Sequence, residues 1–371
     1  MLFQPPLPPQ YARMTEREMF DRIRAHKAAF GRRLVILGHH YQQDEVIQFA
    51  DFTGDSLKLS QLASKQPDAE YVVFCGVHFM AESADILTRE DVSVILPDLS
   101  AGCSMADMAM IEQVEDAWDR FAEATDAKII PITYVNSTAD VKAFCGRNDG
   151  ACCTSSNARQ VLEYALTQGD KVLFLPDQHL GRNTAYAMGN PLESMVIYDP
   201  HAPNGGLTDA QIAEAKFILW KGHCSVHQLF TVEHCEQIRK NDPQAKIIVH
   251  PECRWEVVQR ADLAGSTEYI LKVLDEAPEG TSWAVGTEAH LVNRLANRYA
   301  GRKYIRSLAG IQCLCTTMYR IDLPHLTWSL DELAAGRVVN RIKVHPQTRQ
   351  EALLALQRML DNVSATPVSA K

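Results

Sequence analysis

The sequence lacks several features that define well-known protein classes. Its ten cysteines form no Cys-x-x-Cys pair, which excludes a zinc ribbon, a thioredoxin motif and a ferredoxin-type run of cluster ligands. No stretch approaches about 18 consecutive apolar residues, so no membrane span is expected. The first residues, MLFQPPLPPQYARM, have neither a basic nor an apolar signal-peptide region. We therefore expect a cytoplasmic protein whose cysteines are buried thiols or metal ligands rather than disulfides.

The composition is that of a globular protein with more than one domain. The chain has 371 residues, of which 46% are hydrophobic and 22% are charged, so the apolar content is ample for a core. Its length gives two to three domains as a first expectation. The net charge of −9 argues against nucleic acid as a main partner. It leaves small anionic substrates open, because a pocket can be locally positive.

Short apolar runs alternate with helical patterns along most of the chain. Such runs are typical of buried parallel strands joined by helices in βαβ units, so the sequence predicts an α/β fold. A capping box at Thr15 and Glu18 begins an amphipathic helix over 15–29. The nine runs that we predict to be strands are 34–37, 71–74, 92–96, 128–135, 172–175, 217–220, 246–250, 283–286 and 304–308.

The same order of events occurs three times. A strand ends in polar residues, a hydroxyl motif begins a helix, a second strand follows, and a cysteine comes after the third strand. From the strand end to the cysteine the spans are 64, 88 and 65 residues (103 − 39, 224 − 136 and 315 − 250). We therefore predict three pseudo-symmetric βαβαβ domains, each a three-layer αβα arrangement, around one central site at the carboxyl ends of the strands. The predicted segments are an N-terminal Pro-rich segment and helix (1–30), three α/β domains (31–125, 126–243 and 244–345) and a C-terminal helix and tail (346–371).

Cys103, Cys224 and Cys315 hold equivalent places in the three repeats. If the repeats surround one axis, three thiolates converge, and three cysteine ligands on a [4Fe–4S] cluster leave one iron open as a Lewis acid. A lone cysteine is most often a small buried hydrophobic residue, and Cys313 is a near competitor of Cys315.

The hydroxyl motifs and strand ends supply polar groups of two kinds. A serine or threonine at a helix start is commonly an N-cap, but three helix N-termini aimed at one cavity would suit a substrate with several negative charges. The strand ends add acid, base and hydrogen-bonding groups. The hydroxyls are those of Ser56, Ser155 and Thr267, and the other groups are those of His39, Tyr41, Tyr134, Asn136, His227, His250 and Glu252.

An ordered set of motifs over roughly residues 30–330 resembles the quinolinate synthase family, the A protein of bacterial NAD biosynthesis. The motifs are HHYQQDEV, AGCSMADM, YVNS, CCTSSNA, PDQHLGRN, KGHCSVH, HPEC, AGST and a late C-x-x-M. The resemblance implies a triangle of three α/β domains around one oxygen-sensitive [4Fe–4S] cluster. It also implies condensation of iminosuccinate with dihydroxyacetone phosphate to quinolinate, phosphate and water.

The resemblance also implies roles for individual residues. Cys103, Cys224 and Cys315 would be the cluster ligands, although Thr316 replaces the proline that often follows the third. Tyr41, His227 and Glu252 match residues with catalytic roles. A functional link is implied to an L-aspartate oxidase or aspartate dehydrogenase that supplies iminosuccinate, with no nucleic-acid or membrane partner. The implied contacts of iminosuccinate are His39, Ser56, Tyr134, Val135, Asn136, Ser155, His250, Pro251, Glu252 and Thr267.

Two other functional classes remain open on the residues alone. An iron–sulfur sensor would need only the three cysteines and would leave the predicted anion pocket and the His-Pro-Glu motif unexplained. A zinc hydrolase could use the histidines and cysteines, but the sequence has no HExxH or comparable ligand pair.

Overall fold

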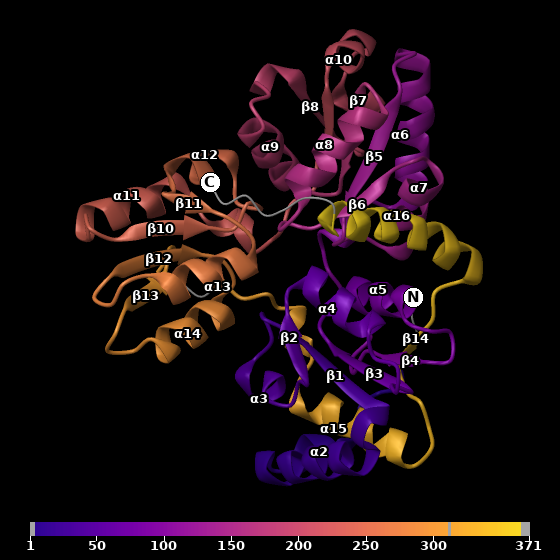
Figure 1. Cartoon of the computed structure of the whole chain (residues 1–371), viewed down its shortest axis with the longest axis vertical. Coiled ribbons are helices and arrows are strands. Elements are labelled where there is room, and N and C mark those ends of the chain that lie inside the picture. Colours follow the sequence, from indigo (N-terminus) through magenta and orange to yellow (C-terminus); the bar gives the residue numbers. More distant parts are fainter. Residues whose placement is uncertain (1–3, 311–312, 365–371) are drawn as a thin grey trace. The chain divides into compact units, whose positions relative to one another are not determined.

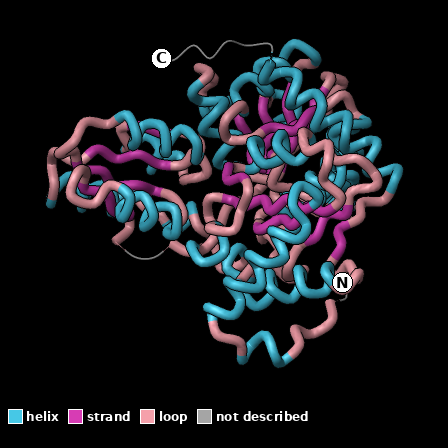
Figure 2. Tube along the Cα trace, turned by 60° about the horizontal axis from the view of Figure 1, so that its bottom comes forward, coloured by secondary structure: helices cyan, strands magenta, loops and turns pink. Residues whose placement is uncertain are grey.

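The computed structural model describes residues 4–310 and 313–364. These residues form two compact units, each built from segments that are separated along the chain. The first takes its described residues from Met1–Cys103, Glu288–Arg298 and Leu314–Val344, and the second from Ser104–Thr287, Tyr299–Cys313 and His345–Lys371. Helices and strands alternate along both (Figures 1 and 2).

The first unit contains a five-stranded sheet in the order β14-β4-β3-β1-β2. The strand β1 (Leu34–His39), which lies between β3 and β2, is buried at every residue, as expected for a parallel strand covered on both faces. Only β14 runs antiparallel to its neighbour. The other elements are β2 (Phe52–Gly54), β3 (Tyr71–Cys75), β4 (Ser93–Ile95), β14 (Arg341–Ile342), α1 (Pro9–Arg13), α2 (Glu16–Phe30), α3 (Asp44–Ile47), α4 (Ser56–Ser64), α5 (His78–Leu87), α14 (Ala289–Arg298) and α15 (Leu323–Ala334).

In the second unit, one sheet is a fully parallel set of five strands in the order β6-β5-β7-β9-β8. Figure 1 shows α6, α7, α8 and α9 alongside these strands. The elements are β5 (Ile129–Tyr134), β6 (Ala151–Cys153), β7 (Lys171–Leu175), β8 (Met195–Tyr198), β9 (Phe217–Trp220), α6 (Ile111–Ala124), α7 (Ala139–Arg147), α8 (Ala158–Gln168), α9 (Gln178–Ala187) and α10 (Asp209–Glu214).

The C-terminal helix α16 (Pro346–Ser364) packs along α7 and β6 in this unit. Arg358 Nη1 donates to the carbonyl oxygens of Gly146 and Gly150, at 2.9 and 2.6 Å. A Cβ at Gly146 would lie 1.8 Å from the carbonyl oxygen of Glu351, so only glycine allows this approach of the two helices.

A second sheet of the same unit has four parallel strands in the order β11-β10-β12-β13. The strand β10 leads directly into the His-Pro-Glu motif, which therefore lies at the carboxyl end of the sheet, where parallel sheets bind ligands. The elements are β10 (Lys246–Val249), β11 (Leu263–Ala264), β12 (Ser282–Gly286), β13 (Tyr304–Ser307), α11 (Val232–Asn241), α12 (Trp255–Arg260) and α13 (Thr267–Glu276).

The α/β fold class and all nine predicted strands are confirmed within one or two residues at each end. The helix predicted over 15–29 is α2, and its capping box forms through Thr15 and Glu18. In the described part of the chain, no helix combines the length and apolar composition needed to cross a bilayer. The bounds of the three predicted domains stay a prediction.

Candidate active site

The second unit brings together a buried chain of three polar side chains, Glu252 and Thr287 just after the strands β10 and β12 and His227 in a short 3₁₀ helix after β9. His227 Nδ1 lies 2.7 Å from Glu252 Oε2, and its Nε2 lies 3.1 Å from Thr287 Oγ1. His227 and Glu252 are 1% and 3% exposed, and Thr287 is fully buried. A carboxylate that accepts from Nδ1–H fixes the tautomer with an acceptor at Nε2, facing the threonine hydroxyl. This chain can therefore carry a proton between a hydroxyl and the imidazole.

His250 flanks this chain on the other side of Glu252. Its ring stacks on that of His227 at 4.5 Å between centroids, and its Nε2 lies 3.2 Å from Ser155 Oγ. Burial lowers the pKa of His250 to about 3, so the ring is neutral at neutral pH. Its Nδ1 accepts the N–H of Glu252 at 3.3 Å, which leaves Nε2–H to donate to Ser155.

Glu252 is ionised in this setting. Burial by itself raises the pKa of the Glu252 carboxyl, but electrostatic interaction with the adjacent imidazole rings of His250 and His227 and hydrogen bonds from His227 and Tyr134 outweigh burial and lower it. The buried Asp177 carboxyl behaves oppositely, because burial first and the charge of Glu252 second raise its pKa well above the usual range. The pKa values of the two carboxyl groups therefore shift in opposite directions, a separation typical of functional sites.

Cys224 lies beside the same chain of residues. A ligand atom of each of Cys224, His227 and Glu252 lies within 4.8 Å of the others. Tyr134 ends β5, and Val135 and Asn136 follow it. The side-chain oxygen of Asn136 is buried with no hydrogen-bond partner in the described structure. An orphaned acceptor of this kind costs free energy unless a ligand donates to it. The side-chain oxygen of Asn136 is therefore available to accept a hydrogen bond from a ligand, as a substrate contact would require.

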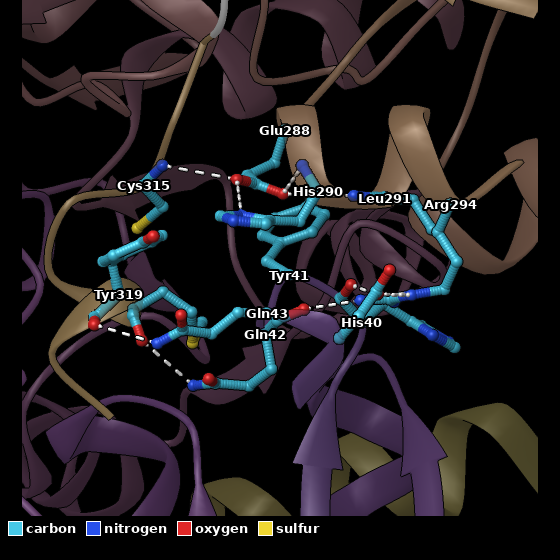
Figure 3. A network of polar contacts seen from close by, with 12 residues as sticks. His40, Tyr41, Gln42, Gln43, Glu288, His290, Leu291, Arg294, Cys315 and Tyr319 are labelled. Atoms are coloured by element: carbon cyan, nitrogen blue, oxygen red, sulfur yellow. Dashed lines mark hydrogen bonds and ion pairs between the residues drawn. The ribbon is translucent and has the colours of Figure 1, made fainter. Parts of the chain in front are cut away.

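The first unit holds a second group of predicted site residues in the loop after β1 (Figure 3). His39 ends the strand, and its Nδ1 accepts the N–H of Tyr41 at 3.2 Å. The rings of His39 and Tyr41 meet edge to face at 4.7 Å between centroids. This places the Tyr41 side chain on a fixed turn rather than on a free loop.

Cys315 is tied to the start of α14 in the same unit. The buried Glu288 accepts from the N–H groups of His290 and Cys315, at 2.8 and 3.5 Å, and from His290 Nδ1 at 2.9 Å. The hydrogen bond to Glu288 raises the pKa of His290 against the effect of burial. Figure 3 shows this network between Cys315, Glu288 and His290. The loop of Cys315 is therefore anchored through its backbone.

The cysteines divide into two groups by exposure, and all ten lie in the described ranges. Cys103, Cys224 and Cys315 are partly exposed, whereas the other seven are buried. Burial raises the pKa of the fully buried thiols Cys75, Cys145, Cys152, Cys153 and Cys253, and it also raises that of Cys315. Exposure, rather than pKa, therefore separates the two groups. A metal ligand must present its sulfur atom, so exposure favours the three cysteines that the repeat selects.

The hydroxyl residues at the helix starts are not the caps of their helices. The N-caps of α4, α8 and α13 are Asp55, Asn157 and Ser266, so the cap interpretation of Ser56, Ser155 and Thr267 is wrong. Their hydroxyl groups stand in the first turn or just before it. Helix N-termini of this kind suit anions, which leaves the anion-pocket interpretation as a prediction.

Sequence patterns did not predict three residues of these groups, Thr287 and Asp177 in the second unit and Glu288 in the first. Thr287 and Glu288 directly follow β12, and Asp177 follows β7 at the matching place. The signal that could have identified them is their position within two residues of a strand end, which they share with Tyr134 and His250.

The buried His179 of α9 provides a test of these electrostatics. Burial first, and then the Arg182 guanidinium, lower the pKa of His179 to about 4. The unfolded chain takes up this proton near pH 6.5, so the stability from the neutral ring is present above pH 6.5 and is lost as pH falls. The advantage of wild type over His179→Gln should therefore shrink by about 1.4 kcal/mol per pH unit between about pH 6 and 4. Denaturant titrations measure it, with exposed His201→Gln as control, and a pH-independent difference would contradict it.

Comparison with known proteins gives the same assignment along nearly the whole chain. Residues 21–361 match the family described as Quinolinate synthetase A protein. A quinolinate synthase from Halalkalibacterium halodurans is 58% identical over 355 residues, 96% of each chain. Another from Streptomyces coelicolor is 57% identical over 346 residues, 92% of this chain and 88% of the relative. The chain belongs to the quinolinate synthetase A protein family.

Proposed function

We propose that this protein condenses iminosuccinate with dihydroxyacetone phosphate to give quinolinate, phosphate and water. The observation that carries the proposal is the buried Thr287–His227–Glu252 chain beside Cys224, in a protein of this family. The reaction must form a C–C bond and a C–N bond, release phosphate and remove hydroxyl groups. Such a reaction moves protons, and the site holds two carboxyl groups, of Glu252 and Asp177, whose pKa values shift in opposite directions.

A [4Fe–4S] cluster held by Cys103, Cys224 and Cys315 is the cofactor of this proposal. The three partly exposed cysteines fit it, and the cluster would supply an open iron as a Lewis acid for a substrate oxygen. The chain's own residues do the rest. Glu252 holds the His227 tautomer whose Nε2 faces the Thr287 hydroxyl, and His227 takes and returns protons there. Tyr41 is the proposed second proton-transfer group.

The proposed substrate contacts supply groups for the two carboxylates and the imine of iminosuccinate. His250 and Ser155 form a hydrogen-bonded pair at the end of β10, and Asn136 offers an unpaired acceptor to the imine N–H. Ser56 and Thr267 lie in the first turns of α4 and α13, and the dipoles of these helices favour an anion at their N-termini. His39, Tyr134, Val135 and Pro251 complete the proposed contacts. The protein is proposed to act in the cytoplasm, where an L-aspartate oxidase or aspartate dehydrogenase would supply the imine.

Anaerobic purification tests the proposal directly. We expect brown protein with about four irons per chain, colour that fades in air, and quinolinate formed from the two substrates. Chromatography of the product and iron and sulfide analysis measure this. Colourless protein that holds stoichiometric zinc would contradict the cluster, and iron-loaded protein that makes no quinolinate would contradict the reaction.

A further inference from the structure

Two predicted catalytic residues lie at the same position of two closely similar turns. In the first, Gln42 N–H donates to the His39 carbonyl oxygen at 3.0 Å, and Tyr41 N–H donates to His39 Nδ1 at 3.2 Å. In the second, Cys253 N–H donates to the His250 carbonyl oxygen at 3.0 Å, and Glu252 N–H donates to His250 Nδ1 at 3.3 Å. Tyr41 and Glu252 are thus equivalent, each two residues after a strand-end histidine.

In each turn, a side chain from a distant helix donates hydrogen bonds to the backbone carbonyl groups on both sides of that residue. We call such a pair of hydrogen bonds a grip. Asn183 Nδ2 of α9 donates to the carbonyl oxygens of Pro251 and Cys253, both at 2.8 Å. Arg294 of α14 donates from Nη1 to the His40 carbonyl oxygen at 2.9 Å and from Nη2 to that of Gln42 at 2.5 Å. Figure 3 shows Arg294 beside His40 and Gln42. The gripped carbonyl groups directly precede and follow Glu252 in one turn and Tyr41 in the other.

The two gripping residues are themselves equivalent in the repeat. Asn183 stands eight residues after the end of β7, and Arg294 eight after the end of β12 (183 − 175 and 294 − 286). An acidic residue stands two positions after each strand, and its carboxylate accepts N–H groups at the start of the helix, in Asp177 and in Glu288. The same arrangement, in which a residue of the helix after a strand holds a turn, therefore occurs in two repeats with different side chains.

These contacts fix three successive peptide planes around each predicted catalytic residue. The grips hold the planes before and after it, and the hydrogen bond within the turn holds the plane between them. Asn183 is buried, and its own Oδ1 has no partner in the described structure. An unpaired buried oxygen costs free energy. The Asn183 amide accepts this cost while its N–H groups donate to two carbonyl groups, so its orientation is set by these donated hydrogen bonds.

We propose that Asn183 and Arg294 are positioning residues that hold Glu252 and Tyr41 in the geometry for turnover, a proposal that rests on the function proposed above. They act on the backbone and need not touch substrate. Misplacing a reacting group by about 1 Å can cost about 100-fold in rate, so such grips matter to the reaction more than to the stability of the fold.

Hydrogen exchange tests the grips without reference to activity. In the anaerobically purified holoprotein, Asn183→Ala should speed amide exchange in peptides that cover residues 250–253, and Arg294→Met in those that cover residues 40–43. Thr184→Ala is the control in α9, because its hydroxyl donates to the carbonyl oxygen of Leu180 within its own helix. Asp44→Asn is the control for Arg294, because it removes the exposed ion pair and keeps both carbonyl contacts. Unchanged exchange in the gripped turns would overturn the proposal.

Kinetics test whether the grips serve the reaction. Asn183→Ala and Arg294→Met should lower kcat by about 10- to 100-fold with KM within about threefold, unchanged iron content and melting temperatures close to those of the controls. Arg294→Lys should recover part of the rate, because an ammonium group can still donate to one carbonyl. Since Arg294 is only half-buried, its variants decide the question even if the buried Asn183 does not tolerate replacement.

A double-mutant comparison separates positioning from a general structural role. In Glu252→Asp, which keeps the charge but displaces the carboxylate, Asn183→Ala should add less than about threefold, because coupled residues are not additive. If the two substitutions lower kcat by the product of their separate effects, or if only KM changes, the proposal is overturned. A wild-type protein that makes no quinolinate would instead contradict the proposed function, and the exchange experiment would still decide the grips.

Discussion

Cys315→Ser is expected to lose the iron–sulfur cluster and with it all quinolinate formation, whereas Cys313→Ser keeps both. The two residues are separated by one position, so spacing along the chain barely distinguishes them. Exposure does distinguish them, because the Cys313 side chain is fully buried and Cys315 is partly exposed. A fully buried thiol is placed for packing, and a ligand must present its sulfur.

The local structure around Cys315 favours the same choice. Its N–H lies 3.5 Å from Glu288 Oε1, and its Sγ lies 3.5 Å from Thr317 Oγ1. Gln42 and Gln43 donate to the carbonyl oxygens of Met318 and Ile321, at 3.1 and 2.9 Å, and so hold the segment that follows. A ligand on an anchored segment needs little reorganisation to bind a metal.

Iron and sulfide analysis with the visible spectrum measures the outcome. Cys313→Ser is the matched control, since it makes the same atomic change two residues away. We expect a four-iron spectrum and wild-type turnover in that variant and colourless, inactive protein in Cys315→Ser. The opposite pattern would show that Cys313 is the ligand.

The strands that the sequence predicted and those that it missed differ in their place in the sheets. The nine apolar runs include every interior strand. The five missed strands, β2, β6, β8, β11 and β14, all lie at the ends of their sheets. An edge strand has one neighbour and is often short and partly exposed, as β11 is with two residues. Such a segment needs no continuous apolar run, so hydrophobic patterning does not reveal it.

The sequence predicted the site residues that lie next to strand ends. It did not predict those whose role depends on contacts with distant segments of the chain. His250 and Glu252 follow a strand directly, and a repeat of strand-end polar residues identifies them. Asn183 and Arg294 lie in the middle of helices, and their effect depends on backbone carbonyl groups 68 and 254 positions away. The sequence contains no local sign of such a contact, because a polar residue in a helix is usually solvated.

Replacing Glu252 by glutamine is expected to stop turnover while iron content and substrate binding stay close to wild type. Glutamine keeps the size of the side chain, so the packing around this buried position is retained. It removes the anionic acceptor 2.7 Å from His227 Nδ1. The amide can also present N–H to the ring, which favours the tautomer that turns Nε2–H toward Thr287 and removes the base there. General acid–base catalysis contributes about 10²- to 10⁴-fold, so the remaining turnover should be about 1% of wild type or less.

The control for this experiment is Glu256→Gln, the same change at an exposed residue four positions along the chain. Quinolinate formation under saturating substrates gives kcat, and product or substrate-analogue titration gives the binding constant. Iron content separates a catalytic loss from a damaged cluster site, because Cys224 lies within 4.8 Å of the Glu252–His227 pair. A Glu252→Gln protein with full iron and wild-type turnover would reduce Glu252 to a packing residue. A loss of iron in proportion to activity would assign it to the integrity of the cluster site rather than to proton transfer.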